Sequence, residues 1–492
     1  MHQPDRVSFQ VSTSSSPPGR QVSAEAGPRR SVFAVGFPQR SFLCMKHDSL
    51  PTALPIAPVD RPIVGRVRPP GSKSITNRAV ICAALARGTS RLTGVLDSDD
   101  TRVMVAGLDQ LGVSIEADWP AHRLTVTGTA GDIPAAAAVI DCRASGTTMR
   151  FLAAVCSLGR GRFVLDGTPR MRQRPIGDLL AALRSLGIEA AAGSPGECPP
   201  VEIRADGIKA AAATIAGNTS SQFASGLALA APCMPDGLEL ELAGRLVSTP
   251  YLTLTRRVLE AFGGRCDVVG SRRWMIAATG YTACDYSIEP DASAASYFAA
   301  AAAITGGRVE LIGLGRESLQ GDLEFCRLLE QMGCQLAWAD EAGREPAVTV
   351  TGGSLRGIDV DMNAISDTVM TLAAVALFAE GPTTIRNVAH IRDKETDRIA
   401  DLTRELRRLG AGVEERPDGL TITPAPLQPA AIKTYDDHRM AMSLALVGLA
   451  SPGVTILDPA CVSKTFPHYW TVLETLASGP AVPRAGGSGS PG

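Results

Sequence analysis

A repeated unit of about 73 residues constrains the fold of this 492-residue chain more than any other feature. Each copy has a polar, hydroxyl-rich opening, an apolar helical stretch, a glycine turn and a β-like run. The openings start at Ser72, Ser145, Asn218, Asp291, Ser366 and Asp436, and the turns fall at Gly88, Gly161, Gly237, Gly307, Gly381 and Gly453. Such a unit is too large for a solenoid repeat and too small to be stable alone. We therefore expect two groups of three units.

A second amphipathic helix, ending at a glycine, follows the β-like run in the first five copies. These helices are predicted at Val103–Leu111, Leu179–Leu186, Val258–Phe262, Phe325–Met332 and Ile399–Leu409. Their apolar residues have the helical period, and the closing glycine suits a left-handed C-cap. A short alternating stretch after the glycine predicts a strand. Each unit thus holds two helices and about four strands, and the sixth is cut short at 473–477.

Composition excludes several classes of protein. The chain is 45% hydrophobic with a net charge of -2, which supports large cores and argues against a polyanion-binding surface. An aromatic content of 4% argues against base-stacking platforms for nucleic acid. Eleven cysteines without a C-x-x-C pair indicate reduced thiols in a cytoplasmic compartment. The longest apolar runs are too short to cross a membrane, so we expect a soluble cytoplasmic protein.

The two ends differ from the rest of the chain. Residues 1–58 are rich in Ser, Pro and Arg and lack both apolar periodicity and the apolar core of a secretory signal. They are interpreted as a disordered extension, a targeting segment, or sequence upstream of a true start at Met45; we favour disorder or the later start. Residues 479–492 are expected to be a disordered tail.

The stretch Pro70–Arg78 opens the first helix with cations. Lys73 lies in its first turn and Arg78 about one turn later. Cations are unfavourable beside the positive end of a helix, so their presence indicates an anion site. The ordinary alternative is a capped surface helix, but Arg150, Arg439 and Lys464 stand beside other openings. Two sets of three helix N-termini, facing one another, would form a positively charged cleft.

Eight motifs connect the chain to a known family. They are Gly71-Ser72-Lys73-Ser74 with Asn77-Arg78, Gly146-Thr147-Thr148-Met149-Arg150, Pro169–Pro175, Ser220-Ser221-Gln222-Phe223, Ser248-Thr249-Pro250-Tyr251, Arg392–Arg398, Asp437–Ala441 and Lys464-Thr465-Phe466-Pro467. In these motifs the chain resembles the enolpyruvyl transferases, and within them the EPSP synthases (3-phosphoshikimate 1-carboxyvinyltransferases), over about residues 62–476. One motif could arise by chance, but eight in family order could not.

The resemblance implies an α/β (α+β) fold, a two-domain inside-out α/β barrel of six βαβαββ repeats, three per domain. Two crossovers are expected near Pro70 and Glu289. The upper domain would then span 71–289, and the lower domain would comprise 59–70 and 290–478. The family's substrates lie between the two halves, which close on binding.

The reaction implied by the resemblance moves the enolpyruvyl group of phosphoenolpyruvate to the 5-hydroxyl of shikimate 3-phosphate. It proceeds through a tetrahedral ketal and releases phosphate, with no metal and no cofactor. Addition needs a base for the hydroxyl and an acid for the methylene carbon. The family pattern assigns the base to Asp367 and the acid to Glu395, although the two could exchange roles. Lys73 and His438 complete the catalytic set, with a structural role as the alternative for His438.

The resemblance also divides the binding residues between the two substrates. For shikimate 3-phosphate they are Lys73, Ser74, Arg78, Ser220, Ser221, Gln222, Ser248, Tyr251, Asp367, His390 and Lys394. For phosphoenolpyruvate they are Lys73, Gly146, Thr147, Arg174, Gln222, Arg398, Arg439 and Lys464. Guanidinium groups suit bidentate contacts with carboxylate and phosphate, whereas lysines act as point charges.

Three positions depart from the family pattern. Ala144 stands where Asn is common, Phe151 where many members have Pro, and His390 where Asn is usual. The catalytic assignment is unaffected, but sensitivity to glyphosate, the family's inhibitor at the phosphoenolpyruvate site, is put in doubt. We still expect glyphosate to bind.

Two alternative functions are weighed. The sister enzyme that uses UDP-N-acetylglucosamine carries a reactive cysteine in a Cys-x-x-x-x-Arg-Pro context, which neither Cys142 nor Cys156 has. A non-catalytic repeat protein could bind phosphorylated ligands. In a protein that only binds anions, however, the negative charges of Asp367 and Glu395 would oppose that binding. A monomer is expected, because closure of two halves needs no subunit interface.

Overall fold

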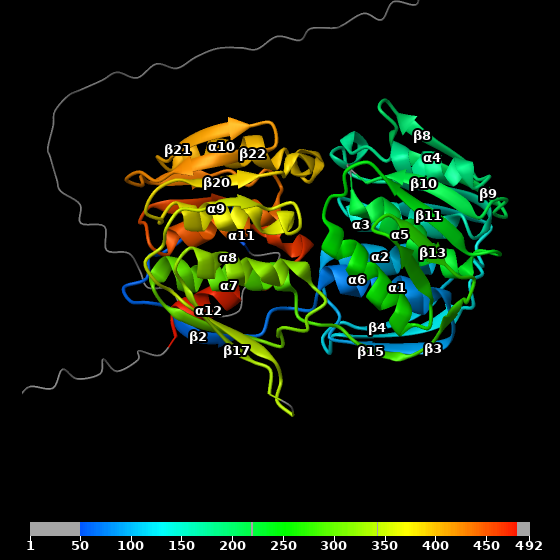
Figure 1. The fold of residues 1–492 in the computed structure, drawn as a ribbon, viewed down its shortest axis with the longest axis horizontal. Helices are drawn as coiled ribbons and strands as arrows, with labels where there is room; N and C mark the ends of the chain where they lie inside the picture. Colours follow the sequence, from blue (N-terminus) through cyan, green and yellow to red (C-terminus); the bar gives the residue numbers. More distant parts are fainter. Residues whose placement is uncertain (1–49, 218–219, 342, 480–492) are drawn as a thin grey trace, which may run out of the picture. The chain divides into compact units, whose positions relative to one another are not determined.

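The structure is a computed structural model that describes residues 50–217, 220–341 and 343–479. In this part of the chain six sheets and their helices form two halves (Figure 1). The buried apolar side chains form two separate clusters, one within 75–288 and the other from 63–67 and 292–476. The predicted two-domain α/β fold is confirmed. We retain the domain limits at 70/71 and 289/290 as a proposal that these two cores support.

Three repeats build the upper half. The first contains α1 (Lys73–Leu85), β3 (Ala86–Thr93), α2 (Asp99–Gln110), β4 (Ser114–Asp118) and β5 (Arg123–Thr129). The second contains β6 (Ala137–Asp141), α3 (Gly146–Cys156), β7 (Arg160–Asp166), α4 (Gly177–Ser185), β8 (Glu189–Ser194) and β9 (Cys198–Asp206). The third contains β10 (Ala212–Ala216), α5 (Ser221–Ala230), β11 (Leu238–Ala243), α6 (Thr249–Ala261), β12 (Cys266–Val269) and β13 (Arg273–Ile276). In the second and third, the first two strands pair in parallel and the last strands pair antiparallel.

The lower half repeats the same plan. Its first repeat contains β2 (Val64–Val67), α7 (Ala292–Thr305), β16 (Arg308–Ile312), the 3-10 turn η4 (Gly321–Leu323), α8 (Glu324–Gln331), β17 (Gln335–Ala339) and β18 (Ala347–Thr351). The next contains β19 (Asp359–Asp361), η5 (Ser366–Thr368), α9 (Val369–Ala376), β20 (Thr383–Arg386), η6 (Ala389–Asp393), α10 (Arg398–Arg408), β21 (Gly412–Arg416) and β22 (Gly419–Thr423). The last contains β23 (Ala430–Ile432), α11 (His438–Gly448), β24 (Val454–Leu457), η7 (Pro459–Lys464) and α12 (Tyr469–Ala477).

The halves exchange their first strands. β2 comes before the upper half in the chain but pairs in parallel with β16 of the lower half. Conversely, β14 (Tyr281–Thr282) and β15 (Asp285–Ser287) follow the third repeat and pair in parallel with β3 of the first. The chain therefore passes between the halves twice, once before α1 and once before α7, as Figure 1 shows.

One expectation about the N-terminus is wrong. Residues up to 58 were assigned to the extension, but Ala53–Pro55 form β1, which pairs antiparallel with β24. The amide of Ile56 also donates to the carbonyl of Val454 at 2.9 Å. A strand of three residues is too short to show periodicity, and its partner lies some 400 residues along the chain. Met45 and residues 480–492 lie outside the described residues, so those expectations are not tested.

Glycines make the predicted turns and helix ends. At Gly161, with φ +152°, an added Cβ would lie 1.9 Å from the carbonyl oxygen of Ala136, so the turn admits no side chain there. The five glycines that close the second helices all have positive φ: Gly112, Gly187, Gly263, Gly333 and Gly410. These values confirm the predicted left-handed C-caps.

The first helix of each repeat lies inside its half and the sheets lie outside. Nearly every residue of α1 and α7 is buried, so each of these helices is enclosed on all sides by its own half. In the lower half α7, α9 and α11 pack against one another, and Figure 1 shows sheets above and below them. Within the described ranges, we find no helix with both the length and the apolar character that a bilayer span requires.

Candidate active site

A polar cavity lies between the two halves. The first turns of α1, α3 and α5 face it from the upper half. The start of η5, the loop before α10 and the start of α11 face it from the lower half. Its lining residues are Lys73, Asp100, Gly146, Thr147, Arg174, Gln222, Asp367, Lys394, Glu395, Arg398, His438 and Arg439. All of them except Asp100 were predicted as site residues.

Asp100 at the start of α2 joins two lysines from opposite halves. Its carboxylate lies 3.0 Å from Nζ of Lys73 and 2.8 Å from Nζ of Lys464. Burial opposes a charge on Asp100, but Lys464 and Lys73 outweigh it and lower its pKa. Asp100 is therefore an ionised anchor for both cations. Sequence reasoning missed it, because an acid in a first helical turn is ordinary.

The candidate base, Asp367, lies between two arginines. Nη2 of Arg439 is 2.7 Å from its Oδ2, and Nη1 of Arg398 is 3.3 Å from its Oδ1. Burial disfavours the charge, but Arg439, Lys394 and Arg398 reverse that effect and hold its pKa below the ordinary range. Asp437, completely buried, accepts from Nε of Arg398 at 2.7 Å and fixes this guanidinium in place.

The candidate acid, Glu395, faces the same cavity. Its Oε2 accepts from Nη2 of Arg398 at 2.9 Å, while Oε1 lies 3.8 Å from Lys464 and 4.0 Å from Arg174. Burial favours the neutral form, but Arg398, Arg174 and Lys464 hold the pKa of Glu395 well below its usual range. Both carboxylates are ionised before any anionic ligand neutralises these cations.

Two other cavity residues are titratable. His438 is 1% exposed, and in the described part of the structure neither ring nitrogen has a hydrogen-bond partner. Burial, followed by Arg439 and Lys73, holds its pKa well below the ordinary value, so the imidazole is neutral. Burial also lowers the pKa of Lys394 to about 8.

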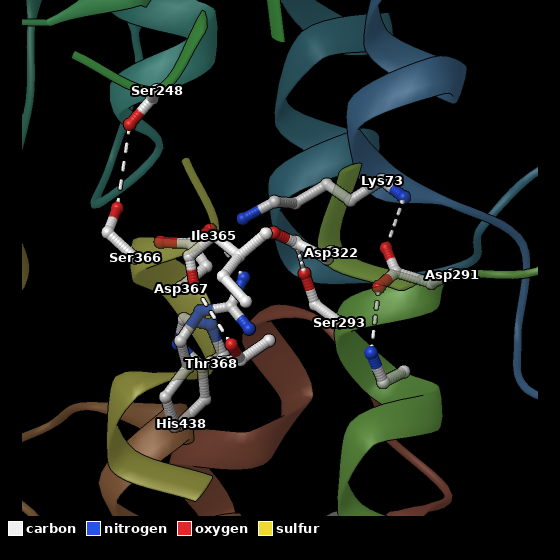
Figure 2. A network of polar contacts seen from close by, with 12 residues as sticks. Lys73, Ser248, Asp291, Ser293, Asp322, Ile365, Ser366, Asp367, Thr368 and His438 are labelled. Carbon is white, nitrogen blue, oxygen red and sulfur yellow. Dashed lines mark hydrogen bonds and ion pairs between the residues drawn. The ribbon is translucent and has the colours of Figure 1, made fainter. Parts of the chain in front are cut away.

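Ser248, Ser366 and His390 form a second contact between the halves, and Figure 2 shows its two serines. Nε2 of His390 lies 2.8 Å from Oγ of Ser366 and 3.4 Å from Oγ of Ser248. The two hydroxyl oxygens are 3.5 Å apart. Burial, and then the charge of Lys394, lowers the pKa of His390 to about 4. The imidazole is therefore neutral at physiological pH.

Tyr251 carries a third contact between the halves. Its hydroxyl lies 2.8 Å from Oδ2 of Asp322 and 3.3 Å from Oδ2 of Asp367. Ser293 at the start of α7 donates to the same oxygen of Asp322, as Figure 2 shows. Asp291, one residue before α7, accepts from the amides of Lys73 and Ala294, so one carboxylate serves the starts of α1 and α7. Neither Asp322 nor Ser293 was among the predicted site residues.

Arg78 points into the upper half. Its side chain is 2% exposed, and Nε donates to Oγ1 of Thr255 at 2.8 Å while Nη1 donates to the carbonyl of Ser74 at 2.9 Å. Its guanidinium lies 5.2 Å from the ring centre of Phe151, and burial lowers its pKa to about 10. Ser74 itself lines a neighbouring small cavity with Tyr251.

The start of α5 holds the three expected polar residues. Ser220 caps the helix by accepting from the amide of Gln222 at 3.3 Å, and Ser221 is its first residue. Gln222 lines the cavity, and its Oε1 accepts from Nη1 of Arg150 at 2.8 Å. The preceding residues 218 and 219 lie outside the described part of the chain.

Arg170 joins the halves without facing the cavity. Its Nη2 donates to the carbonyl of Lys394 at 2.9 Å, and its Nε donates to the carbonyl of Glu395 at 3.1 Å. Nη2 also lies 3.4 Å from the carbonyl of Arg392. We call Arg170 with these carbonyls the 170 clasp. It holds the main chain that carries Glu395.

The arrangement suits a small ligand with several negative charges. Five cations line the cavity: Lys73, Arg174, Lys394, Arg398 and Arg439. Lys464 also donates to the carbonyl of Ala144 at 2.7 Å, which places it at the start of α3. Helix N-termini add positive potential, and two carboxylates supply groups for proton transfer. In the described ranges, no group of three or more His, Cys, Asp or Glu side chains is arranged to hold a metal ion.

Comparisons with known proteins agree with this geometry. The family described as EPSP synthase (3-phosphoshikimate 1-carboxyvinyltransferase) matches residues 59–473. A 3-phosphoshikimate 1-carboxyvinyltransferase of Nostoc punctiforme is 46% identical over 418 residues, covering 85% of this chain and 97% of the relative. The chloroplastic protein of that name from Brassica napus is 43% identical, covering 85% and 84%. A solved EPSP synthase from Acinetobacter baumannii superposes with a TM-score of 0.72 at 26% identity, covering 86% and 98%.

Proposed function

The chain belongs to the EPSP synthase (3-phosphoshikimate 1-carboxyvinyltransferase) family of transferases, and from this premise we propose its reaction in detail. It transfers the enolpyruvyl group of phosphoenolpyruvate to the 5-hydroxyl of shikimate 3-phosphate and releases phosphate. The product, 5-enolpyruvylshikimate 3-phosphate, leads to chorismate and the aromatic amino acids.

The observation that carries this proposal is the pair of carboxylates inside a ring of cations. Two substrates bring two phosphates and two carboxylates, and cations from both halves surround the cavity. Asp367 and Glu395 share Arg398, which places them on the same side of the cavity but bonded to different nitrogens. A site for anion binding alone would have no use for two ionised carboxylates.

The residues divide into roles. Asp367 accepts the proton of the 5-hydroxyl. Glu395 takes up a proton once the bound substrates neutralise its cations, and it delivers that proton to the methylene carbon as the carbon–oxygen bond forms. Arg174, Arg439, Lys73 and Lys464 bind phosphoenolpyruvate and oppose the charge of the ketal.

His438 has a structural role in this proposal. A neutral imidazole with neither nitrogen hydrogen-bonded does not fit proton transfer in the closed site. Its buried ring packs in the wall of the cavity instead.

We assign the shikimate 3-phosphate side of the site to Ser74, Lys394 and the start of α5, with Arg78 held against Ser74, to whose carbonyl it donates at 2.9 Å. The Ser248–Ser366–His390 contact supports a further position for its phosphate, with His390 in place of the family's usual Asn. The negative charges of a phosphate bound there would favour the protonated forms of Lys394 and His390 and raise the pKa values of both groups.

We also propose that the protein works as a cytoplasmic monomer, because both halves of the site come from one chain. Size-exclusion chromatography with light scattering at micromolar concentration tests this. A mass of about one chain supports it, and a stable dimer contradicts it.

Phosphate release from phosphoenolpyruvate tests the function. With shikimate 3-phosphate as acceptor and without added metal, the enzyme should release phosphate and form the enol ether. With UDP-N-acetylglucosamine it should release none. Turnover with the nucleotide sugar alone would overturn the substrate assignment, and binding without turnover would favour the non-catalytic alternative.

A further inference from the structure

Tyr251 has one hydroxyl proton and two carboxylate neighbours. Its oxygen lies 2.8 Å from Oδ2 of Asp322 and 3.3 Å from Oδ2 of Asp367, and a single O–H can donate to only one of them at a time. Ser293 already uses its own proton toward Asp322. When both carboxylates are ionised, these three contacts therefore share two protons. One added proton would complete all three hydrogen bonds.

Asp322 is placed to control where that proton goes. It is 5% exposed, and in the described part of the chain its Oδ1 has no hydrogen-bond partner. The shorter of the two Tyr251 contacts is to Asp322, so the phenolic proton points there and an oxygen lone pair faces Asp367. When Asp367 is protonated, it can therefore donate a hydrogen bond to the hydroxyl oxygen of Tyr251.

This matters because Asp367 is a poor base by itself. Arg439 and Arg398 both bond to it, and such partners stabilise its ionised form at the expense of proton uptake. A buried negative charge at Asp322, joined to Asp367 through one hydroxyl group, has the opposite effect and favours proton uptake by Asp367.

We propose that Asp322 is a positioning residue that, through the hydroxyl of Tyr251, enables Asp367 to take the proton of the substrate 5-hydroxyl. This inference rests on the proposed function. The O–H bond of the substrate breaks and its electron pair forms the new bond to carbon 2 of phosphoenolpyruvate, while the carbon–carbon π pair takes a proton from Glu395 and makes the methyl group of the ketal. The hydroxyl proton settles on Oδ2 of Asp367, which then donates to Tyr251, which donates to Asp322. In the elimination the methyl group returns a proton to Glu395, the carbon–oxygen bond to phosphate breaks, and the proton held by Asp367 leaves with the phosphate, so charge and protons balance.

Other charged groups set the pH range in which this works. The groups facing Asp322 are Tyr251 on α6, Asp291 before α7, Asp367 on η5 and Arg439 on α11. On the neighbouring α8, Glu324 and Arg327 pair with each other at the surface. Burial, and then the charge of Asp367, raises the pKa of Asp322 to about 6. Below that pH, Asp322 is already protonated from solvent, so the hydrogen-bond network can no longer accept the proton of the substrate hydroxyl.

The test compares Asp322→Asn and Tyr251→Phe with the wild-type enzyme in the phosphate-release assay across pH 5–9. Asp322→Asn should lower kcat by about tenfold to a hundredfold, a part of what a general base contributes. Its KM for both substrates should stay within about threefold, and the acid limb near pH 6 should disappear. Tyr251→Phe keeps the ring packing and should also lose this limb, and the double variant should be no slower than the slower single variant.

Glu405→Gln is the matched control. Glu405 is also a completely buried carboxylate with a tyrosine donor, because Tyr435 donates to it at 2.7 Å, but Glu405 does not line the cavity. It should leave kcat and the pH profile unchanged. An Asp322→Asn enzyme with wild-type kcat and an unchanged acid limb would overturn the inference, and so would a Tyr251→Phe enzyme that keeps the limb. A wild-type enzyme that is inactive with shikimate 3-phosphate would instead refute the proposed function.

Discussion

Replacing Arg170 by alanine should weaken closure of the two halves without damaging either core. Arg170 is half-buried, and it donates to main-chain carbonyls of Lys394 and Glu395 at 2.9 and 3.1 Å. A hydrogen bond from a charged group contributes about 1.5–3 kcal/mol when it is well shielded. Allowing for partial exposure, we take about 2 kcal/mol for the 170 clasp, which corresponds to about a 30-fold shift toward the open state.

The assay is steady-state kinetics with both substrates. We expect kcat/KM to fall about 30-fold, and kcat to fall less, because saturating ligands drive closure by themselves. Arg170→Lys should be intermediate, since a lysine keeps the charge but not the fork of donors. The melting temperature should change little, because each half has its own core.

Arg172→Ala is the matched control for this prediction. Arg172 lies in the same motif, but it is exposed and pairs with Asp166 of its own half, with Nε 2.9 Å from the carboxylate. It should change kcat/KM by less than about twofold. If Arg170→Ala is equally mild, or if Arg172→Ala is equally damaging, closure by the 170 clasp is refuted.

Three further predictions concern single residues. Glu395→Gln should lower turnover by about 10²–10⁴-fold while phosphoenolpyruvate still binds, measured by calorimetry; unchanged turnover would remove Glu395 from the acid role. His390 binds protons less readily in the folded state (pKa about 4) than in the unfolded chain, where it is about 6.5, so stability should fall as pH drops from 6.5 toward 4. Denaturant unfolding gives the free energy of unfolding of His390→Asn minus that of the wild type. This difference should be about 2–3 kcal/mol more in favour of the variant at pH 4.5 than at pH 7.5; an equal difference at both pH values would contradict this. Glyphosate should compete with phosphoenolpyruvate, and Ala144→Asn should tighten its binding by up to about tenfold through one added hydrogen bond; absence of competition would refute the first expectation.

The repeat and the motifs predicted much of the fold and the cavity. Glycines at regular spacing require particular backbone conformations, so their positions in the sequence locate turns and helix ends directly. Lys73, Gly146 and Arg439 could be placed near one another because each stands at the opening of a repeat. Only the fold, however, shows that Asp367 and Glu395 share one arginine.

The remaining features depend on contacts between distant segments. Asp322 lies in the short turn η4, which matches none of the repeat openings, and its partners Tyr251, Ser293 and Asp367 come from three other segments. Asp100 meets Lys464 across 364 residues. β1 pairs with a strand near the other end of the chain. No local pattern encodes such pairs, because each residue type is ordinary in its own segment.

Phosphate release from phosphoenolpyruvate by the purified protein, measured with each acceptor in turn, decides whether this chain is the proposed transferase. We expect release with shikimate 3-phosphate, none with UDP-N-acetylglucosamine, and loss of release in Asp367→Asn with substrate binding retained. Release that persists in Asp367→Asn at the wild-type rate, or that requires the nucleotide sugar, would contradict this expectation.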